Sequence, residues 1–298
     1  MIRHVIRGIA IAAGAAAVPL ALAVPGSAEI VWGNNHIGNQ AGAPAAVGDP
    51  FGYTTDLTGQ GPAARAVYRA AGGHIEELSL LIPNQGWHAA DLTALTDAPA
   101  AASAPFGFTT SLTDQSPAAR VVYRTAGGHI EELALPSGGS WSAVDLTALT
   151  GAPTAVGAPF GFTTALTGQD QAARVVYRTA GRGHIEELAS SGGSWSAVDL
   201  TALTGAPTAA GTPFGYTTTL TDQGPTARVV YRTAGRHIEE LALPSGGAWQ
   251  ADDLTAVSGA PDTASAPFGY TTTLTGQVPA ARVVYRAAGN DVEELSAG

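Results

Sequence analysis

The sequence predicts an all-β fold, a five-bladed β-propeller of four-stranded antiparallel blades, on three observations. The composition is 45% apolar with 38 Gly and 19 Pro, too apolar for a disordered chain and too rich in helix breakers for a helical bundle. A repeat of 54 or 55 residues fills residues 29–298. Each repeat contains four short segments of strand composition, a pattern typical of propeller blades.

The charge balance argues against a protein that binds the backbone of nucleic acids. The chain has 14 Arg, no Lys and 24 Asp plus Glu, which gives a formal net charge of −10. Nucleic-acid binding requires clustered positive charge instead. The chain also has no Cys, so an exported form would need a sizeable core to be stable without disulfides.

Residues 1–28 have the three-part layout of a secretory signal peptide. A basic start at residues 3–7 precedes an apolar run at residues 8–24, and Gly26-Ser27-Ala28 offers a small-residue cleavage site. A membrane anchor is the alternative, but the run is short and contains Pro19. We therefore expect a secreted, extracellular protein with no membrane insertion after the leader is removed.

Three motifs define the repeat. Pro-Phe-Gly-Tyr/Phe-Thr-Thr has its Phe at positions 51, 106, 160, 214 and 268; Val-Tyr-Arg has its Tyr at 68, 123, 177, 231 and 285; Trp recurs at 32, 87, 141, 195 and 249. Every series advances by 55, 54, 54 and 54 residues, so five units account for residues 29–298 as one domain.

The unit that begins at Phe106 shows the expected strands. Aromatic and β-branched residues predict strands at 106–112, 120–125, 129–135 and 141–147. Turn residues separate them at 114–117, 127–128 and 136–139. The third unit has one extra residue, Arg182, in the second of these turns, where a surface loop tolerates an insertion.

The ends of the repeat series favour a closed ring over an open solenoid. The series opens on the Trp32 part of a unit and stops at Glu293-Glu294-Leu295, before the next Trp would come. An N-terminal strand that completes the last blade would explain this offset and remove the exposed sheet edges.

The segments Arg-Val-Val-Tyr, Gly-His-Ile-Glu-Glu and Gly-Gly-x-Trp resemble the repeats of the fucose-specific β-propeller lectins of fungi and bacteria. The resemblance implies a sugar between neighbouring blades, with hydroxyls bound by Arg and Glu and an apolar face covered by an aromatic ring of an adjacent blade. The implied sugar-binding residues are Arg65, Glu77, Trp87, Arg120, Glu132, Trp141, Arg174, Glu187, Trp195, Arg228, Glu240, Trp249, Arg282, Glu294 and Trp32.

Two features depart from that family. Its members often have a second aromatic residue shortly after the Glu, where this chain has Leu135, which leaves the sugar open. Five blades in one chain is also not the usual count for the fungal members. The chemistry is still suitable, because guanidinium donors, a carboxylate acceptor and an indole face together match a sugar and require no metal or cofactor.

A structural ion pair is the alternative role for these Arg and Glu residues. A two-residue loop at Gly127-Gly128 would place Arg124 opposite Glu131 and send Arg120 and Glu132 to opposite faces. A three-residue loop would place Arg120 and Glu132 on one face. Trp has an alternative role as packing between sheets. Tyr123 and its equivalents are expected in the core, and the recurring His as strand-start residues.

The sequence therefore favours a multivalent, non-enzymatic lectin for fucosylated or related glycans, because five similar sites strengthen one another by avidity. A propeller scaffold for protein–protein interaction would explain the fold but not the strict repetition of Arg and Glu. A glycosidase is less favoured, because it needs one asymmetric pair of carboxylates with tuned pKa values.

Overall fold

The computed structural model describes residues 33–81, 86–112 and 115–298. The chain divides into two units, Met1–Asn35 and His36–Gly298, and the β-sheets belong to the second. The expected signal peptide and Trp32 lie outside the described residues. In the described part of the chain, no helix is long and apolar enough to cross a membrane.

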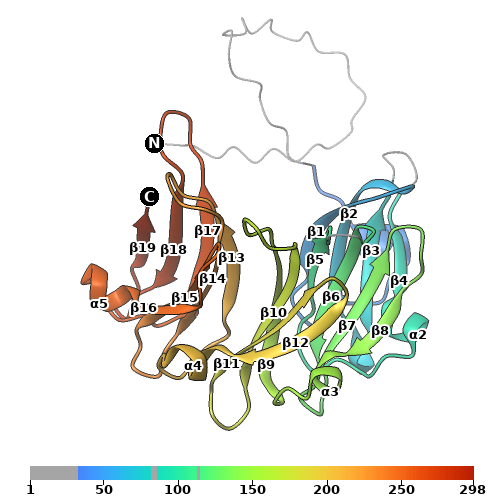
Figure 1. The fold of residues 1–298 in the computed structure, drawn as a ribbon. Helices are drawn as coiled ribbons and strands as arrows, with labels where there is room; N and C mark the ends of the chain where they lie inside the picture. Colours follow the sequence, from blue (N-terminus) through green and yellow to red (C-terminus); the bar gives the residue numbers. More distant parts are fainter. Residues whose placement is uncertain (1–32, 82–85, 113–114) are drawn as a thin grey trace, which may run out of the picture. The chain divides into compact units, whose positions relative to one another are not determined.

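Unit His36–Gly298 contains five antiparallel sheets whose strands pair in chain order (Figure 1). The strands are β1 (Phe51–Leu57), β2 (Gly61–Arg69), β3 (Ile75–Leu80) and β4 (His88–Asp91) in sheet 1; β5 (Phe106–Thr110), β6 (Ala118–Arg124), β7 (Ile130–Pro136) and β8 (Ser142–Asp145) in sheet 2; β9 (Ala155–Thr164), β10 (Ala172–Thr179), β11 (Ile185–Ser191) and β12 (Ser194–Asp199) in sheet 3; β13 (Phe214–Thr218), β14 (Thr226–Arg232), β15 (Ile238–Pro244) and β16 (Gln250–Asp253) in sheet 4; β17 (Phe268–Thr272), β18 (Ala280–Arg286) and β19 (Val292–Ala297) in sheet 5. The all-β prediction is confirmed. Sheet 5 has three strands among the described residues.

The last predicted strand of each unit is shorter than expected, because its end is a helix. In sheet 2, β8 ends at Asp145 and helix α3 (Leu146–Thr150) follows. The Asp145 side chain caps this helix by accepting a hydrogen bond from the Ala148 N–H at 2.8 Å, and Gly151 ends it in the left-handed conformation. The equivalent helices are α1 (Ile37–Ala41), α2 (Leu92–Thr96), α4 (Leu200–Thr204) and α5 (Leu254–Ser258); a 3₁₀ turn spans Ala71–Gly73.

The hairpin between β6 and β7 has a three-residue loop. The Thr125 N–H donates to the His129 carbonyl at 2.9 Å, and Gly128 adopts a φ of 83° that favours glycine. This loop pairs Val122 with Glu132 across the two strands. The third unit keeps the equivalent pairing, Val176 with Glu187, because the inserted Arg182 only lengthens the loop.

Each sheet has a forward face, which packs on the next sheet along the chain, and a rear face, which packs on the previous one. At the contact of sheets 2 and 3, forward-face residues of sheet 2 such as Phe108, Val122 and Ile130 meet rear-face residues of sheet 3 such as Val175 and Tyr177. All five are buried, so the core lies between sheets. The prediction that Tyr123 and its equivalents belong to the core is confirmed.

Contacts between the first strands of neighbouring sheets repeat with each unit. The Phe ring centroids of successive units lie 3.9 to 4.1 Å apart, from Phe51 to Phe268. A second series consists of Thr hydroxyls that donate to the Thr carbonyl of the preceding sheet, from Thr109 to Thr54 at 2.6 Å through Thr271 to Thr217 at 3.0 Å. These contacts fix the spacing of the sheets that frame the candidate sites.

Candidate functional site

The three-residue hairpin loop brings Arg120 and Glu132 together on the forward face of sheet 2. Arg120 Nη1 donates to Glu132 Oε1 at 2.6 Å, and Arg120 Nε donates to Thr110 Oγ1 at 2.9 Å. Strands β6, β7 and β5 each supply one member of this network. The register left open by the sequence is thus resolved in favour of Arg120 with Glu132.

The same pair forms in all five sheets. Arg65 lies 2.6 Å from Glu77 and Arg174 lies 2.6 Å from Glu187; Arg228 pairs with Glu240, and Arg282 pairs with Glu294. In sheets 1 to 3 the paired side chains are at most 9% exposed, whereas in sheet 5 the Arg and Glu side chains are 22% and 38% exposed. The Arg–Glu pair is therefore buried in the sheets that are followed by a sheet containing a Trp.

The Trp that faces the pair of sheets 1 to 3 comes from the next sheet. The Arg120 guanidinium carbon lies 5.9 Å from the centroid of the Trp195 ring, and that of Arg174 lies 5.8 Å from Trp249. Trp141 likewise packs into the contact between sheets 1 and 2, where Arg65 and Glu77 lie. Three complete trios of Arg, Glu and Trp therefore occupy the contacts between sheets 1 and 2, 2 and 3, and 3 and 4.

Two predicted trios are not assembled from the described residues. Trp87 packs on the rear face of sheet 1 beside Tyr68 and Ile37, and none of the Arg–Glu pairs of the described residues lies in this cluster. The pair Arg228–Glu240 instead lines a cavity of about 160 Å³ between sheets 4 and 5. At the complete contacts a Trp side chain occupies the corresponding position.

The electrostatics of the pair are those of a buried ion pair. Burial raises the pKa of Glu132, and the Arg120 guanidinium opposes only part of this shift. Burial likewise raises the pKa of Glu187, while Arg174 and a hydrogen bond from the Trp249 side chain oppose the shift. Because each Arg already binds its Glu, a sugar hydroxyl would have to insert between them or displace part of this network.

A second row of carboxylates lies on the rear faces and was not recognised as a site from the sequence. Glu131 pairs in register with Tyr123, and its Oε2 is buried without a hydrogen-bond partner, as are the equivalent atoms of Glu186 and Glu239. Burial raises the pKa of Glu131 to about 7, with a further contribution from the nearby Asp145 carboxylate. Arg124 does not pair with Glu131; its Nε donates to the Gly157 carbonyl at 3.1 Å.

The recurring His residues pair with the Asp that caps each helix. His129 Nδ1 lies 2.5 Å from Asp145 Oδ2, and His74, His184 and His237 have equivalent Asp partners. These His precede strands β3, β7, β11 and β15, as predicted. Within residues 33–81, 86–112 and 115–298, no group of three or more His, Asp and Glu side chains is arranged to hold a metal ion.

We expect the free energy of unfolding to fall as the pH rises from about 4.5 to about 7. Glu131, Glu186 and Glu239 each have a folded-state pKa of about 7 against an ordinary 4.5, so the folded protein binds more protons than the unfolded chain across this window. His237 acts in the same direction, because hydrogen bonding to Asp253 raises its pKa. Urea denaturation at several pH values measures the slope of the free energy of unfolding against pH.

The triple variant Glu131→Gln, Glu186→Gln and Glu239→Gln should have a smaller slope, because its three side chains do not titrate. An equal slope in the variant would contradict the assignment of this pH dependence to the three Glu residues.

The sequence matches no protein-family model, and comparison with curated proteins also gives no match. Solved structures are nevertheless similar in fold. AofleA from Arthrobotrys oligospora matches with a TM-score of 0.55 at 16% identity, over 84% of this chain and 68% of AofleA. Aleuria aurantia lectin, described as a six-bladed β-propeller with a novel fucose recognition mode, matches with a TM-score of 0.52 at 17% identity, over 83% of this chain and 73% of the lectin. The chain therefore has the β-propeller type of fold found in fucose-binding lectins.

Proposed function

We propose that this chain is a multivalent lectin that binds fucose or a similar monosaccharide at the contacts between neighbouring sheets. The observation that carries the proposal is the trio of Arg and Glu from one sheet with Trp from the next, repeated at three successive contacts. The similar structure of Aleuria aurantia lectin, which has been solved in complex with Fucα1-6GlcNAc, supports the sugar class.

The trio contains the groups that a monosaccharide requires. A guanidinium presents donors to hydroxyl oxygens, a carboxylate accepts from hydroxyl hydrogens, and an indole face covers C–H groups and excludes water. A hydroxyl can accept from Arg and donate to Glu at the same time, so it can replace the direct ion pair without leaving either charge unpaired. No metal, cofactor or covalent step enters this scheme, and the function is binding rather than catalysis.

The five sheets form a closed five-bladed ring in this proposal, with the N-terminal segment as the fourth strand of sheet 5. The forward face of sheet 5 is exposed: Leu274 is 50% and Val292 82% exposed, while the equivalent Leu220 and Ile238 of sheet 4 are 6% and 0% exposed. These apolar positions are buried in every other sheet, so their exposure in sheet 5 supports the proposal that another sheet covers this face in the closed ring.

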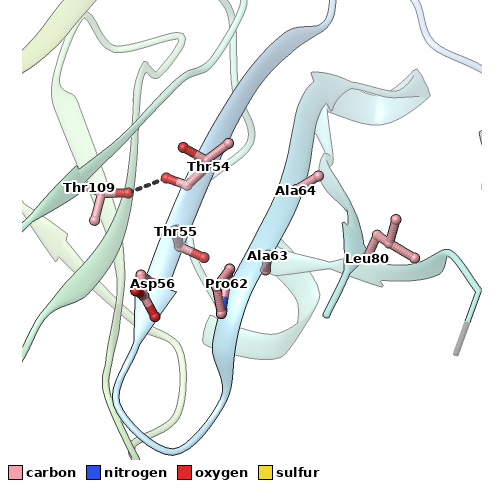
Figure 2. A pocket seen from close by; sticks show the side chains of 8 residues that line it. All are labelled: Thr54, Thr55, Asp56, Pro62, Ala63, Ala64, Leu80 and Thr109. Atoms are coloured by element: carbon pink, nitrogen blue, oxygen red, sulfur yellow. Dashed lines mark hydrogen bonds between the residues drawn. The ribbon is translucent and has the colours of Figure 1, made fainter. Parts of the chain in front are cut away.

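The rear face of sheet 1 supports the same closure. Figure 2 shows Thr54, Asp56, Ala64 and Leu80, together with the hydrogen bond from Thr109 to Thr54. These four side chains line a hollow of about 720 Å³. In sheets 2 to 4 the preceding sheet covers this region, and the counterparts of Ala64 are fully buried. Closure would let the Thr54 hydroxyl donate to the Thr271 carbonyl and so complete the series of Thr bonds.

Closure would also complete the two missing trios. The indole of Trp32 would enter the cavity beside Arg228 and Glu240, and Trp87 would face Arg282 and Glu294. The ring would then carry five sites. Without closure, the three trios already formed would be the only complete ones among the described residues.

The experiment that tests the function is a glycan array with purified residues 29–298. We expect binding to fucosylated glycans and agglutination of cells that display them. The variant Trp141→Ala, Trp195→Ala, Trp249→Ala should lose most of this signal, because the apolar face of the sugar loses its cover. Leu149→Ala, at a helix position that is 60% exposed, is the matched control and should bind normally.

The absence of signal above background for every sugar on the array would reject the lectin function and favour a scaffold for protein–protein interaction. Secretion is part of the proposal and has its own test. The test is to express residues 1–298 and residues 29–298 separately in a secreting host. Only the protein expressed with residues 1–28 should reach the medium, and its leader should have been removed there.

A further inference from the structure

The five candidate sites differ at one aromatic position of the repeat. The residue after the Gly of the Phe-Gly-Tyr/Phe motif is Tyr53 in sheet 1, Phe108 in sheet 2, Phe162 in sheet 3, Tyr216 in sheet 4 and Tyr270 in sheet 5. In every sheet but the last, its ring lies directly against the corresponding Gly of the next sheet. The ring position is therefore constant, and only the hydroxyl differs.

In the Tyr-containing sheets the hydroxyl binds the carboxylate of the site. Tyr53 donates to Glu77 Oε1 at 3.0 Å while Arg65 donates to Glu77 Oε2 at 2.6 Å, so both carboxylate oxygens are engaged. Tyr216 donates to Glu240 at 3.2 Å, and Tyr270 donates to Glu294 at 3.0 Å. The Tyr hydroxyl thus takes acceptor capacity that a sugar hydroxyl would need.

In the Phe-containing sheets the carboxylate has no such donor within its own sheet. Phe108 and Phe162 have no hydroxyl, and Glu132 and Glu187 accept from Arg through Oε1. These are also the two sites at which the Arg guanidinium lies over the Trp ring of the next sheet. Glu187 additionally accepts a hydrogen bond from the Trp249 side chain of the neighbouring sheet, the side chain that a bound sugar would contact.

We infer that this Tyr/Phe position sorts the sites into two classes and determines how strongly each binds a sugar hydroxyl. Sites with Phe108 and Phe162 have no Tyr hydroxyl on the carboxylate, which leaves more acceptor capacity for a sugar hydroxyl, and are the stronger sites. Sites with Tyr53, Tyr216 and Tyr270 are weaker, because the ligand must first displace the Tyr hydroxyl from the carboxylate. This inference rests on the proposed lectin function and makes residue 53 and its equivalents positioning residues for the carboxylate.

The test is a titration of residues 29–298 with α-methyl-L-fucoside by isothermal calorimetry. We expect two strong sites per chain in the unmodified protein. The variant Phe108→Tyr, Phe162→Tyr should weaken them by about tenfold, because a hydrogen bond to a charged group must then be broken. The variant Tyr53→Phe, Tyr216→Phe, Tyr270→Phe should raise the number of strong sites above two. Equal affinity and number of sites in all three proteins would overturn the inference.

A readout without sugar separates failure of the inference from failure of the lectin function. Double-mutant cycles of unfolding should find coupling between Tyr53 and Glu77, using Tyr53→Phe and Glu77→Gln. The matched cycle in sheet 3 uses Phe162→Tyr and Glu187→Gln and should create a coupling of the same sign, since the added hydroxyl reaches the carboxylate. No coupling in either cycle would overturn the inference even if the sugar binds. Coupling between the Tyr hydroxyl and the Glu, without any binding of the fucoside, would confirm that the carboxylates fall into two classes and would reject only the proposed ligand.

Discussion

Gly161→Ala is expected to lower the free energy of unfolding by about 1–3 kcal/mol, the usual range for overpacking in a core. A Cβ at this position would lie 2.3 Å from Cε1 of Phe108, which belongs to the preceding sheet. Phe108 is only 7% exposed and is packed among other core residues, so its ring has no free space to move into. The requirement for Gly is therefore one of close approach between sheets, since the φ of Gly161 is not positive.

The same substitution at Gly52 tests ring closure. In sheet 1 the nearest atom to an added Cβ is the Arg65 carbonyl oxygen at 3.9 Å, because no ring covers this glycine. Closure of the ring would place the Tyr270 ring of sheet 5 against Gly52, in the same way as the Phe108 ring lies against Gly161. We expect Gly52→Ala to be as destabilising as Gly161→Ala, independently of protein concentration, as measured by urea denaturation. A neutral Gly52→Ala would contradict closure, and a loss that depends on concentration would instead indicate a contact between two copies of the chain.

The repeated spacing made the sheets predictable, because length, strand composition and turn residues agree in all five units. The hairpin register was not predictable, because Gly127-Gly128 suits a two-residue as well as a three-residue loop. The structure decides it through Gly128, whose left-handed conformation closes the three-residue loop. That one residue determines whether Arg120 and Glu132 share a face.

The helices and the rear-face carboxylates were missed for different reasons. Helix α3 has only five residues, too few for a helical period to be visible, although Asp145 and Gly151 are suitable capping residues. Glu131 adjoins Glu132 in sequence, and strand alternation alone predicts that they face opposite ways. The sequence does not show how the neighbouring sheet packs on this face. That packing buries Glu131 Oε2 without a hydrogen-bond partner. For the same reason it could not show which sheet supplies the Trp of each trio.

Arg174→Met is expected to lower the free energy of unfolding at pH 7 by about 3–5 kcal/mol, because it leaves a buried carboxylate without its charge partner. Glu187 is 2% exposed, and Arg174 is the opposite charge that counteracts the upward shift of its pKa. Arg178→Met, on the same strand but only partly buried, is the matched control and should lose about 1 kcal/mol or less.

The pH dependence of this loss distinguishes a lost ion pair from a lost packing contact. Without Arg174, the pKa of Glu187 should rise further, so part of the stability lost at pH 7 should return when the carboxyl is protonated at lower pH. A loss from packing alone would be the same at pH 5 and pH 7. The double variant Arg174→Met, Glu187→Leu removes both charges and should regain most of the stability, as apolar replacements of buried ion pairs often do. If it does, the pair is not needed for folding, and its repetition in every sheet is better explained by the binding of a ligand between the sheets.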